Sequence, residues 1–182
     1  MDFQNLFALG MKRYLPPLIA QDGRALDIGA SGKYVAPGAE PVGAPNWLWP
    51  RDKLPADDES IATIHAYHFL EHLNGRDVAT FMRDVERVLI SGGVFNYSIP
   101  YYTSTLSIQN LEHESQWCED TFRNLFEDDR YRHEEGTTWR LSVHFQVIVG
   151  IVQRNLALVG QLVKDSKPIE KPKWFHPSTG GE

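Results

Sequence analysis

The sequence lacks several features that define large classes of protein. Cys118 is the only cysteine among 182 residues, which excludes an intramolecular disulfide and a zinc site made of four cysteines. No run of 18 apolar residues is present, so no membrane-spanning helix is predicted. The first residues also lack the basic-then-apolar order of a signal peptide. We therefore expect a protein of a reducing compartment, the cytoplasm.

The sequence also has fewer basic than acidic residues. The chain has 18 lysines and arginines against 24 aspartates and glutamates, a formal net charge of −6. Proteins that bind nucleic acid usually present a basic face, so this balance disfavours a nucleic-acid partner. Five tryptophans, seven tyrosines and nine phenylalanines exclude wholesale disorder, and the length suits one domain.

Hydrophobic patterns predict strands that alternate with helices. Buried strands are expected at 24–28 and 61–66, and an alternating strand at 94–99 with its aromatic residues and Ile99 on one face. The clearest helix is expected at 76–90, where apolar residues share one face. Ser91-Gly92-Gly93 is expected to cap this helix. Weaker patterns predict a helix at 2–15, a short strand around Trp47 and Trp49, a helix at 119–127, a β-prone stretch at 139–152 and a final helix at 155–164.

This order of elements predicts an α/β fold with a parallel sheet. We expect one domain over residues 1–165, followed by an extended or disordered tail over 166–182. Parallel sheets bind ligands at the carboxyl ends of their strands. Candidate functional residues should therefore follow Ile28, Ile64 and Ile99.

The first such strand end reads Asp27-Ile28-Gly29-Ala30-Ser31-Gly32. Glycines at this place allow a ligand to approach the backbone closely. The segment matches neither the complete dinucleotide pattern nor a phosphate-binding P-loop. From these residues alone, a ligand-binding loop and an ordinary turn both remain open.

The second strand end carries His68-Phe69-Leu70-Glu71-His72, which matches the zinc-peptidase pattern H-x-x-E-H. A zinc site would need a third ligand, for which Glu134 or Glu135 could be nominated. In the alternative without a metal, the His72 side chain makes a capping or packing contact, and Glu71 accepts a local hydrogen bond. The pattern directly follows a buried strand instead of lying within a long helix, so we expect no metal here.

The third strand end precedes Tyr101, His113, Trp117 and Cys118. A nucleophilic pair of Cys118 and His113 is conceivable, but a lone cysteine beside tryptophan is more often a small buried hydrophobe. The aromatic residues either wall a pocket or belong to the core.

Four segments, taken together, narrow the possible protein families. They read ALDIGASG, LPADDES, DDESIATIHAYHFLEHL and FMRDVERVLISGGVFNYSIP. In this order and spacing they resemble the motifs of class I S-adenosylmethionine-dependent methyltransferases, in the small type 11-like group. The resemblance covers residues 24–127. It also explains the H-x-x-E-H pattern as the turn after the family's fourth strand, a turn that binds no zinc.

The resemblance implies a Rossmann-like, mostly parallel sheet with helices on both faces, and methyl transfer from S-adenosylmethionine. In the family, the first loop holds the methionine end of the cofactor and its acidic residue organises the amino group, a charge-assisted pair. For a hydroxyl acceptor, His113 or Tyr101 is a candidate general base. The implied cofactor-binding residues are Asp27, Gly29, Ala30, Ser31, Gly32, Asp52, Tyr67 and His68.

The segment 33–58 departs from the family pattern. It is short, and the acidic residue that ends the second strand and grips the ribose has no clear match. Glu40 is the nearest acid but lies beside Pro41, in a stretch not expected to form a strand. We therefore expect weak cofactor binding, with Trp47 or Trp49 stacking on adenine and with a homo-oligomer or protein partner able to complete the pocket. The alternative is a non-catalytic binding module with this fold, and no motif specifies the methyl acceptor.

Overall fold

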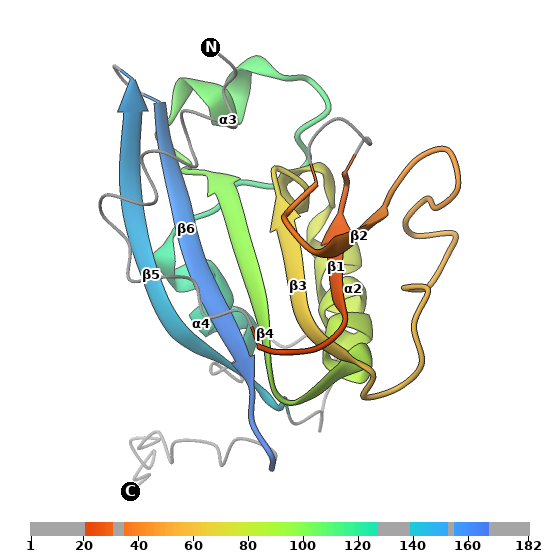
Figure 1. Cartoon of the computed structure of the whole chain (residues 1–182). Coiled ribbons are helices and arrows are strands. Elements are labelled where there is room, and N and C mark those ends of the chain that lie inside the picture. The colour runs from red at the N-terminus through yellow and green to blue at the C-terminus, as the bar shows by residue number, and fades with distance from the viewer. Residues whose placement is uncertain (1–20, 31–34, 127–138, 153–154, 168–182) are drawn as a thin grey trace, which may run out of the picture.

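The computed structural model contains one six-stranded sheet with helices packed against it (Figure 1). It describes residues 21–30, 35–126, 139–152 and 155–167. The helix predicted at 2–15, the loop residues Ser31 and Gly32, the glutamates Glu134 and Glu135, and most of the tail predicted at 166–182 lie outside these residues.

The strands follow the order β2-β1-β3-β4-β6-β5 across the sheet. Their bounds are Ala25–Ile28 for β1, Ala39–Val42 for β2, Ile61–Tyr67 for β3, Leu89–Pro100 for β4, Leu141–Val152 for β5 and Asn155–Lys164 for β6. The first four strands run parallel, whereas β6 runs antiparallel to both β4 and β5. The predicted α/β fold with a mostly parallel sheet is therefore confirmed.

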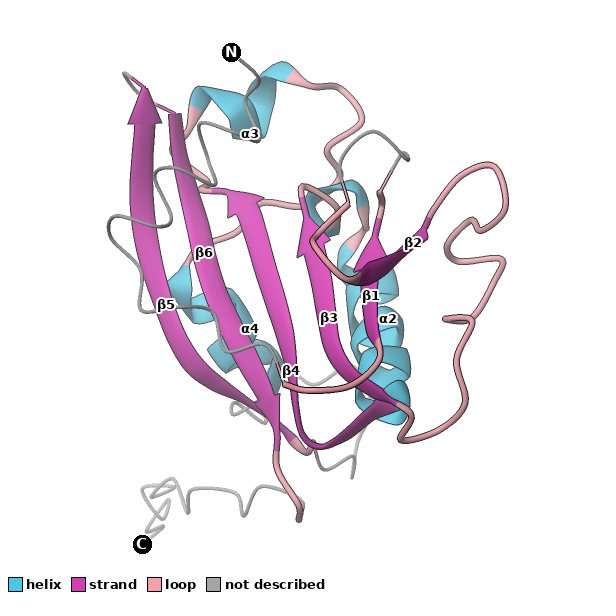
Figure 2. Ribbon diagram, viewed as in Figure 1, coloured by secondary structure: helices cyan, strands magenta, loops and turns pink. Residues whose placement is uncertain are grey.

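The helices lie between the strands along the chain, and the two longer ones cover one face of the sheet (Figure 2). They are η1 (Leu70–His72), a single turn of 3-10 helix, and α2 (Gly75–Val88), α3 (Thr105–Gln109) and α4 (Glu119–Phe126). None of the helices in the described part of the chain has the length and apolar character needed to span a membrane.

Helix α2 forms where the sequence predicts it, but its end differs. The Asn74 side chain caps the helix by accepting hydrogen bonds from the backbone N–H groups of Arg76 and Asp77. The helix ends at Val88, and the next residue already belongs to β4. Gly92, with φ of +77°, therefore lies within the strand and does not cap the helix. Strand β4 begins directly after the helix because its first residue, Leu89, pairs with Ile61 of β3.

Both α2 and α4 pack on the same face of the sheet. The ring of Phe81 in α2 lies 6.4 Å from that of Phe95, and Phe122 in α4 lies 4.6 Å from Tyr97. Phe95 and Tyr97 are two residues apart in β4, so they point to one face. This face carries the main apolar core, which extends from Leu26 in β1 to strand β6.

Residues 155–164 form a strand, so the helix predicted there is wrong. The segment NLALVGQLVK is a short apolar run, a pattern that suits either a helix or a buried strand. In the fold it lies between β4 and β5 and hydrogen-bonds to both. Pairing on two sides overrides the local preference.

The second strand also lies elsewhere than predicted. It is formed by residues 39–42 and runs parallel to β1, with Glu40 opposite Leu26. Pro41 is accommodated because β2 is an edge strand. Trp47 and Trp49 form no strand. Their rings pack 6.0 Å from Phe69 and 5.3 Å from Phe81, respectively.

Candidate functional site at the carboxyl ends of the parallel strands

Asp27 places a buried carboxylate near the end of β1. Its side chain is 5% exposed, and Oδ2 accepts a hydrogen bond of 2.7 Å from the backbone N–H of Ala36. Burial raises the pKa of this carboxyl, and the bond from Ala36 offsets part of the rise. Within the described residues, no lysine, arginine or histidine forms an ion pair with Asp27.

Gly29 forms the tight turn that follows β1. Its φ is +80°, a conformation that favours glycine, and its N–H donates to the carbonyl of Val42 at 2.8 Å. An added Cβ would lie 3.2 Å from the ring of Phe69. On the other side, a Cβ on Gly43 would lie 2.9 Å from the carbonyl oxygen of Ala30. The turn is therefore held between the end of β2 and the segment leading into η1.

The end of β3 supplies a second unusual turn. His68 has φ of +55°, which is uncommon for a non-glycine residue and is a feature found at functional sites. Its N–H donates to the carbonyl of Ser98 at 2.8 Å, and its Nδ1 lies 3.1 Å from Oε1 of Glu71. Burial, together with the negative charge of Asp27, raises the pKa of Tyr67 well above its usual value. The fold therefore brings Asp27 and Tyr67 into electrostatic contact.

The sheet also carries a row of buried and half-buried polar side chains that we did not predict from the sequence. Across four neighbouring strands, Asp27, His65, Asn96 and Gln161 are successive partners in register. Gln161 donates to Oδ1 of Asn96 at 2.7 Å, and burial lowers the pKa of His65 to about 4. The row lies on the face opposite α2 and α4, because side chains alternate along each strand.

The signal for this row was present in the sequence. Polar residues occupy every second position, as Thr63 and His65 in IATIHAY and Asn96 and Ser98 in VFNYSI. We interpreted residues 61–66 only as a buried strand, and in 94–99 we used the alternation to place the apolar residues on one face without asking what the polar residues form on the other. The alternation indicates a sheet with one apolar and one polar face.

Two acids of the 33–58 segment, Asp52 and Glu40, are engaged locally. Asp52 accepts from the N–H of Leu48 at 2.9 Å and pairs with Arg51 at 2.6 Å. Glu40 pairs with Arg24 at 2.7 Å. Each arginine lowers the pKa of its partner carboxyl. Among the described residues, neither acid contacts the turn that follows β1.

The two candidate bases lie in different surroundings. The Tyr101 hydroxyl donates to Oε2 of Glu119 at 3.0 Å, and desolvation together with this carboxylate raises the pKa of Tyr101 to about 12. Nδ1 of His113 lies 3.2 Å from the carbonyl oxygen of Ser107. The ring of His113 makes an edge contact with His72, with centroids 4.8 Å apart.

Trp117 belongs to the core and also borders a pocket. It is 1% exposed and packs on Phe122 at 5.0 Å. A pocket of about 260 Å³ between α2 and α4 includes Trp117 in its wall, but none of the residues expected to bind cofactor. The Cys118 sulfur lies 3.7 Å from the Thr121 hydroxyl.

The comparisons with known proteins agree with this architecture. The family model of the methyltransferase domain (Methyltransf_11) matches residues 50–96, the stretch that contains β3, η1 and α2. No curated protein is significantly similar to the chain in sequence.

Solved methyltransferase structures share the fold at low sequence identity. One is from the complex between the Haloferax volcanii Trm112 methyltransferase activator and a methyltransferase, with 11% identity, a TM-score of 0.60, and coverage of 91% of this chain and 90% of that one. The N-methyltransferase NodS from Bradyrhizobium japonicum has 12% identity and a TM-score of 0.54, covering 89% and 93%. An S-adenosylmethionine-dependent methyltransferase from Mesorhizobium loti has 14% identity and a TM-score of 0.52, covering 89% and 97%. The chain therefore has the class I methyltransferase fold, as the resemblance of its motifs predicted.

Proposed function

We propose that the chain is an S-adenosylmethionine-dependent methyltransferase whose cofactor site is the turn after β1. The observation that carries this proposal is the buried Asp27 carboxylate, which has no basic partner among the described residues and lies beside the left-handed turn at Gly29. The ammonium group of a bound methionine moiety would supply the missing cation. The turn also lies at the carboxyl end of a parallel strand, where α/β sheets bind ligands.

The proposed cofactor site combines two strand ends. Gly29 and Ala30, continued by Ser31 and Gly32, would approach the cofactor through their backbone. Tyr67 and His68 would close the site from the end of β3, and Asp52 is the proposed adenine contact. S-adenosylmethionine supplies an electrophilic methyl group, so the task of these residues is to bind and orient rather than to react.

Of the two candidate bases, His113 is the better choice. The pKa of about 12 and the bond to Glu119 make the Tyr101 phenol a hydrogen-bond donor near neutral pH. A base is needed only if the acceptor is a hydroxyl or a similar weakly acidic group. The class of acceptor is left open in this proposal.

The cofactor should bind weakly to the isolated chain. Glu40 is held by Arg24, and β2 ends in Val42, so no carboxylate takes the ribose-binding place at the end of this strand. A hydrogen bond to a charged group contributes about 1.5–3 kcal/mol, which is roughly tenfold to hundredfold in affinity. We expect a dissociation constant on the order of tens of micromolar or weaker.

Isothermal titration with S-adenosylhomocysteine tests the site. Asp27→Asn keeps the shape of the side chain and removes its charge, so we expect affinity to fall by roughly tenfold or more. Asp120→Asn is the matched control, because Asp120 is exposed on α4 and its side chain is 67% accessible. Equal affinity of the folded Asp27→Asn protein and the native chain would contradict the proposed site.

The second candidate function is a non-catalytic module that keeps the fold and has lost the cofactor. The ion pair between Glu40 and Arg24 favours this second candidate. Glu40 is the acid nearest to the expected ribose contact, and Arg24 already engages its carboxylate. A protein partner or a second copy of the chain would be its ligand. One structural relative was solved in complex with an activator protein. That complex equally supports a catalytic form of this chain in which a protein partner completes the cofactor site. Absence of binding heat at millimolar cofactor, with and without a partner, would favour the module.

A further inference from the structure

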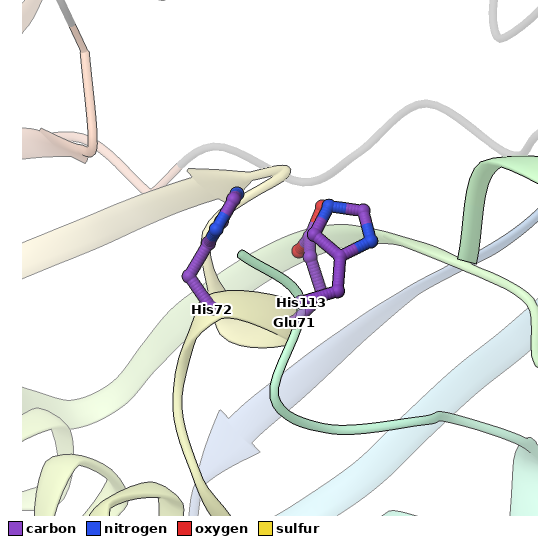
Figure 3. A group of neighbouring side chains, drawn as sticks. All are labelled: Glu71, His72 and His113. Carbon is purple, nitrogen blue, oxygen red and sulfur yellow. The ribbon is translucent and has the colours of Figure 1, made fainter. Parts of the chain in front are cut away.

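The turn after β3 forms part of a second cluster of ionisable side chains. Glu71 and His72 belong to η1, and His113 comes from the loop that follows α3 (Figure 3). Each offers one potential ligand atom, and these atoms lie within 4.8 Å of one another. From the sequence, Glu134 or Glu135 was the nominated third ligand for H-x-x-E-H, and His113 was not among the candidates.

Backbone hydrogen bonds fix the two segments against each other. The N–H groups of Glu114 and Ser115 both donate to the carbonyl of Glu71, at 2.8 and 3.1 Å. The Ser115 hydroxyl donates to the carbonyl of Leu70 at 3.1 Å. His113 is therefore held beside η1 by its own chain neighbours.

The two histidines are oriented in the way that metal-binding histidines are. Nδ1 of His72 lies 3.2 Å from the carbonyl oxygen of Glu112, and Nδ1 of His113 lies 3.2 Å from that of Ser107. A carbonyl oxygen only accepts, so each Nδ1 carries the proton. In the neutral ring Nε2 is then left with a lone pair, and donation from the other ring nitrogen to a carbonyl is typical of metal ligands.

Glu71 gives an independent indication of a ligand. The residue is 1% exposed, and Oε1 is bonded to Nδ1 of His68. Its other oxygen, Oε2, is buried and has no hydrogen-bond partner. A buried unsatisfied carboxylate oxygen is costly, and a cation between it and the histidines would satisfy it.

We propose that Glu71, His72 and His113 bind a divalent transition-metal ion of the zinc type. Two imidazoles and one carboxylate are the donor set that zinc and similar ions take, and three protein ligands leave a coordination position open. Metal–ligand bonds of about 2.0–2.2 Å require the ligand atoms to approach more closely than 4.8 Å. Binding of the ion would therefore draw the three ligand atoms closer together.

The open position gives the site a role in the proposed reaction. It lies beside His68, a proposed cofactor-binding residue, through the bond between His68 and Glu71. An oxygen or nitrogen of the methyl acceptor would coordinate the ion there, which lowers the pKa of a bound hydroxyl. With the ion bound, the lone pair of His113 is engaged as a ligand, so the ion takes the place of His113 in promoting loss of the acceptor proton. The metal site does not depend on the proposed methyltransferase activity. It differs from the expectation drawn from the sequence, in which this turn binds no metal.

Cobalt(II) absorption and zinc calorimetry test the site directly. The protein is prepared without a histidine tag and dialysed against a chelator, and each ion is then titrated alone. We expect one ion per chain, with the visible absorption bands of imidazole-bound cobalt. His113→Ala should weaken binding by more than the roughly 10- to 100-fold that loss of an outer-shell partner costs.

Two further variants keep the result interpretable. Glu71→Gln retains the side-chain shape and should also weaken binding, and circular dichroism shows whether each variant is folded. His144→Ala is the matched control, because His144 is exposed on β5, and binding should be unchanged. Absence of a one-to-one complex, or equal affinity in the folded His113→Ala protein, overturns the metal site. Because S-adenosylhomocysteine binding is measured separately, that result leaves the proposed methyltransferase function untouched.

Discussion

At the scale of single residues, His65 shows how burial controls protonation. Its Nδ1 lies 3.0 Å from the Tyr67 hydroxyl, and it is the register partner of Asp27. Burial lowers the pKa of His65 from 6.5 to about 4, so the folded protein holds this ring neutral. The side chain therefore links the stability of the fold to pH.

We expect His65 to make the protein less stable in mild acid. Below pH 6.5 the unfolded chain binds a proton that folded His65 takes up only near pH 4. Its stabilising contribution is thus complete above pH 6.5 and is lost progressively as the pH falls toward 4. The loss from this residue between about pH 7.5 and about pH 5 should be about 2 kcal/mol.

Urea unfolding of the native chain and of His65→Gln at both pH values measures this contribution. The variant should lose less stability than the native chain, by about 2 kcal/mol. The raised pKa of Asp27 acts in the opposite direction, but it is common to both proteins and cancels. Equal acid sensitivity of the two proteins would show that His65 is solvated in solution.

At the scale of elements, the close approach of β4, β5 and β6 depends on a missing side chain. A Cβ on Gly160 would lie 2.5 Å from Cζ of Tyr97 and 2.6 Å from the carbonyl oxygen of Phe145. The Tyr97 ring is buried, and its hydroxyl donates to Gln146 at 2.8 Å. The Tyr97 ring also packs on Phe122 of α4 at 4.6 Å, and Phe145 lies in the pairing of β5 with β6, so a shift of either neighbour would disturb these contacts.

Gly160→Ala should therefore be strongly destabilising, by roughly 3 kcal/mol or more, at the upper end of overpacking effects. Gly150→Ala in β5 is the matched control, since its Cβ would meet only Leu156, at an ordinary 3.5 Å. That change should alter the free energy of unfolding by less than about 1 kcal/mol. Denaturant titration of both variants measures the difference, and similar losses would mean that β6 does not pair with β4 as described.

At the scale of the whole molecule, the C-terminal end of the described chain is attached to the middle of the chain. Lys164 is 2% exposed, and its Nζ donates to the carbonyl of Leu89 at 2.6 Å and to Glu59 at 3.1 Å. The N–H of Asp165 donates to the carbonyl of Arg140 at 2.7 Å. These contacts attach the end of β6 to the start of β4 and to β5. The domain boundary expected at residue 165 stays a prediction.

Truncation tests this boundary. A chain that ends at Lys167 keeps all these contacts, so its Tm should stay within about 2 °C of the native value and its unfolding should remain a single transition. A chain that ends at Leu162 loses Lys164 and Asp165, and its Tm should fall by roughly 5–10 °C, because about 1 kcal/mol shifts Tm by 2–4 °C at this size. Differential scanning calorimetry measures both. A large fall in Tm for the first truncation would show that the tail is part of the domain.

The sequence determined the elements whose pattern is local. Helix α2 was predictable because its apolar residues recur with the helical period, and β3 because its apolar residues recur at every second position, the period of a strand. The motif order around ALDIGASG and HFLEHL predicted the fold class and the strand ends that carry Asp27 and His68. These features depend on residues that are close along the chain.

The tertiary structure decided the features that depend on pairing across the chain. Residues 155–164 became a strand because β4 and β5 offer hydrogen bonds on both sides. His113 came to lie beside Glu71 through backbone bonds between segments about 40 residues apart. Neither partner is marked in the local sequence, because hydrogen bonds and side-chain contacts of this kind depend on distance in space and not on separation along the chain.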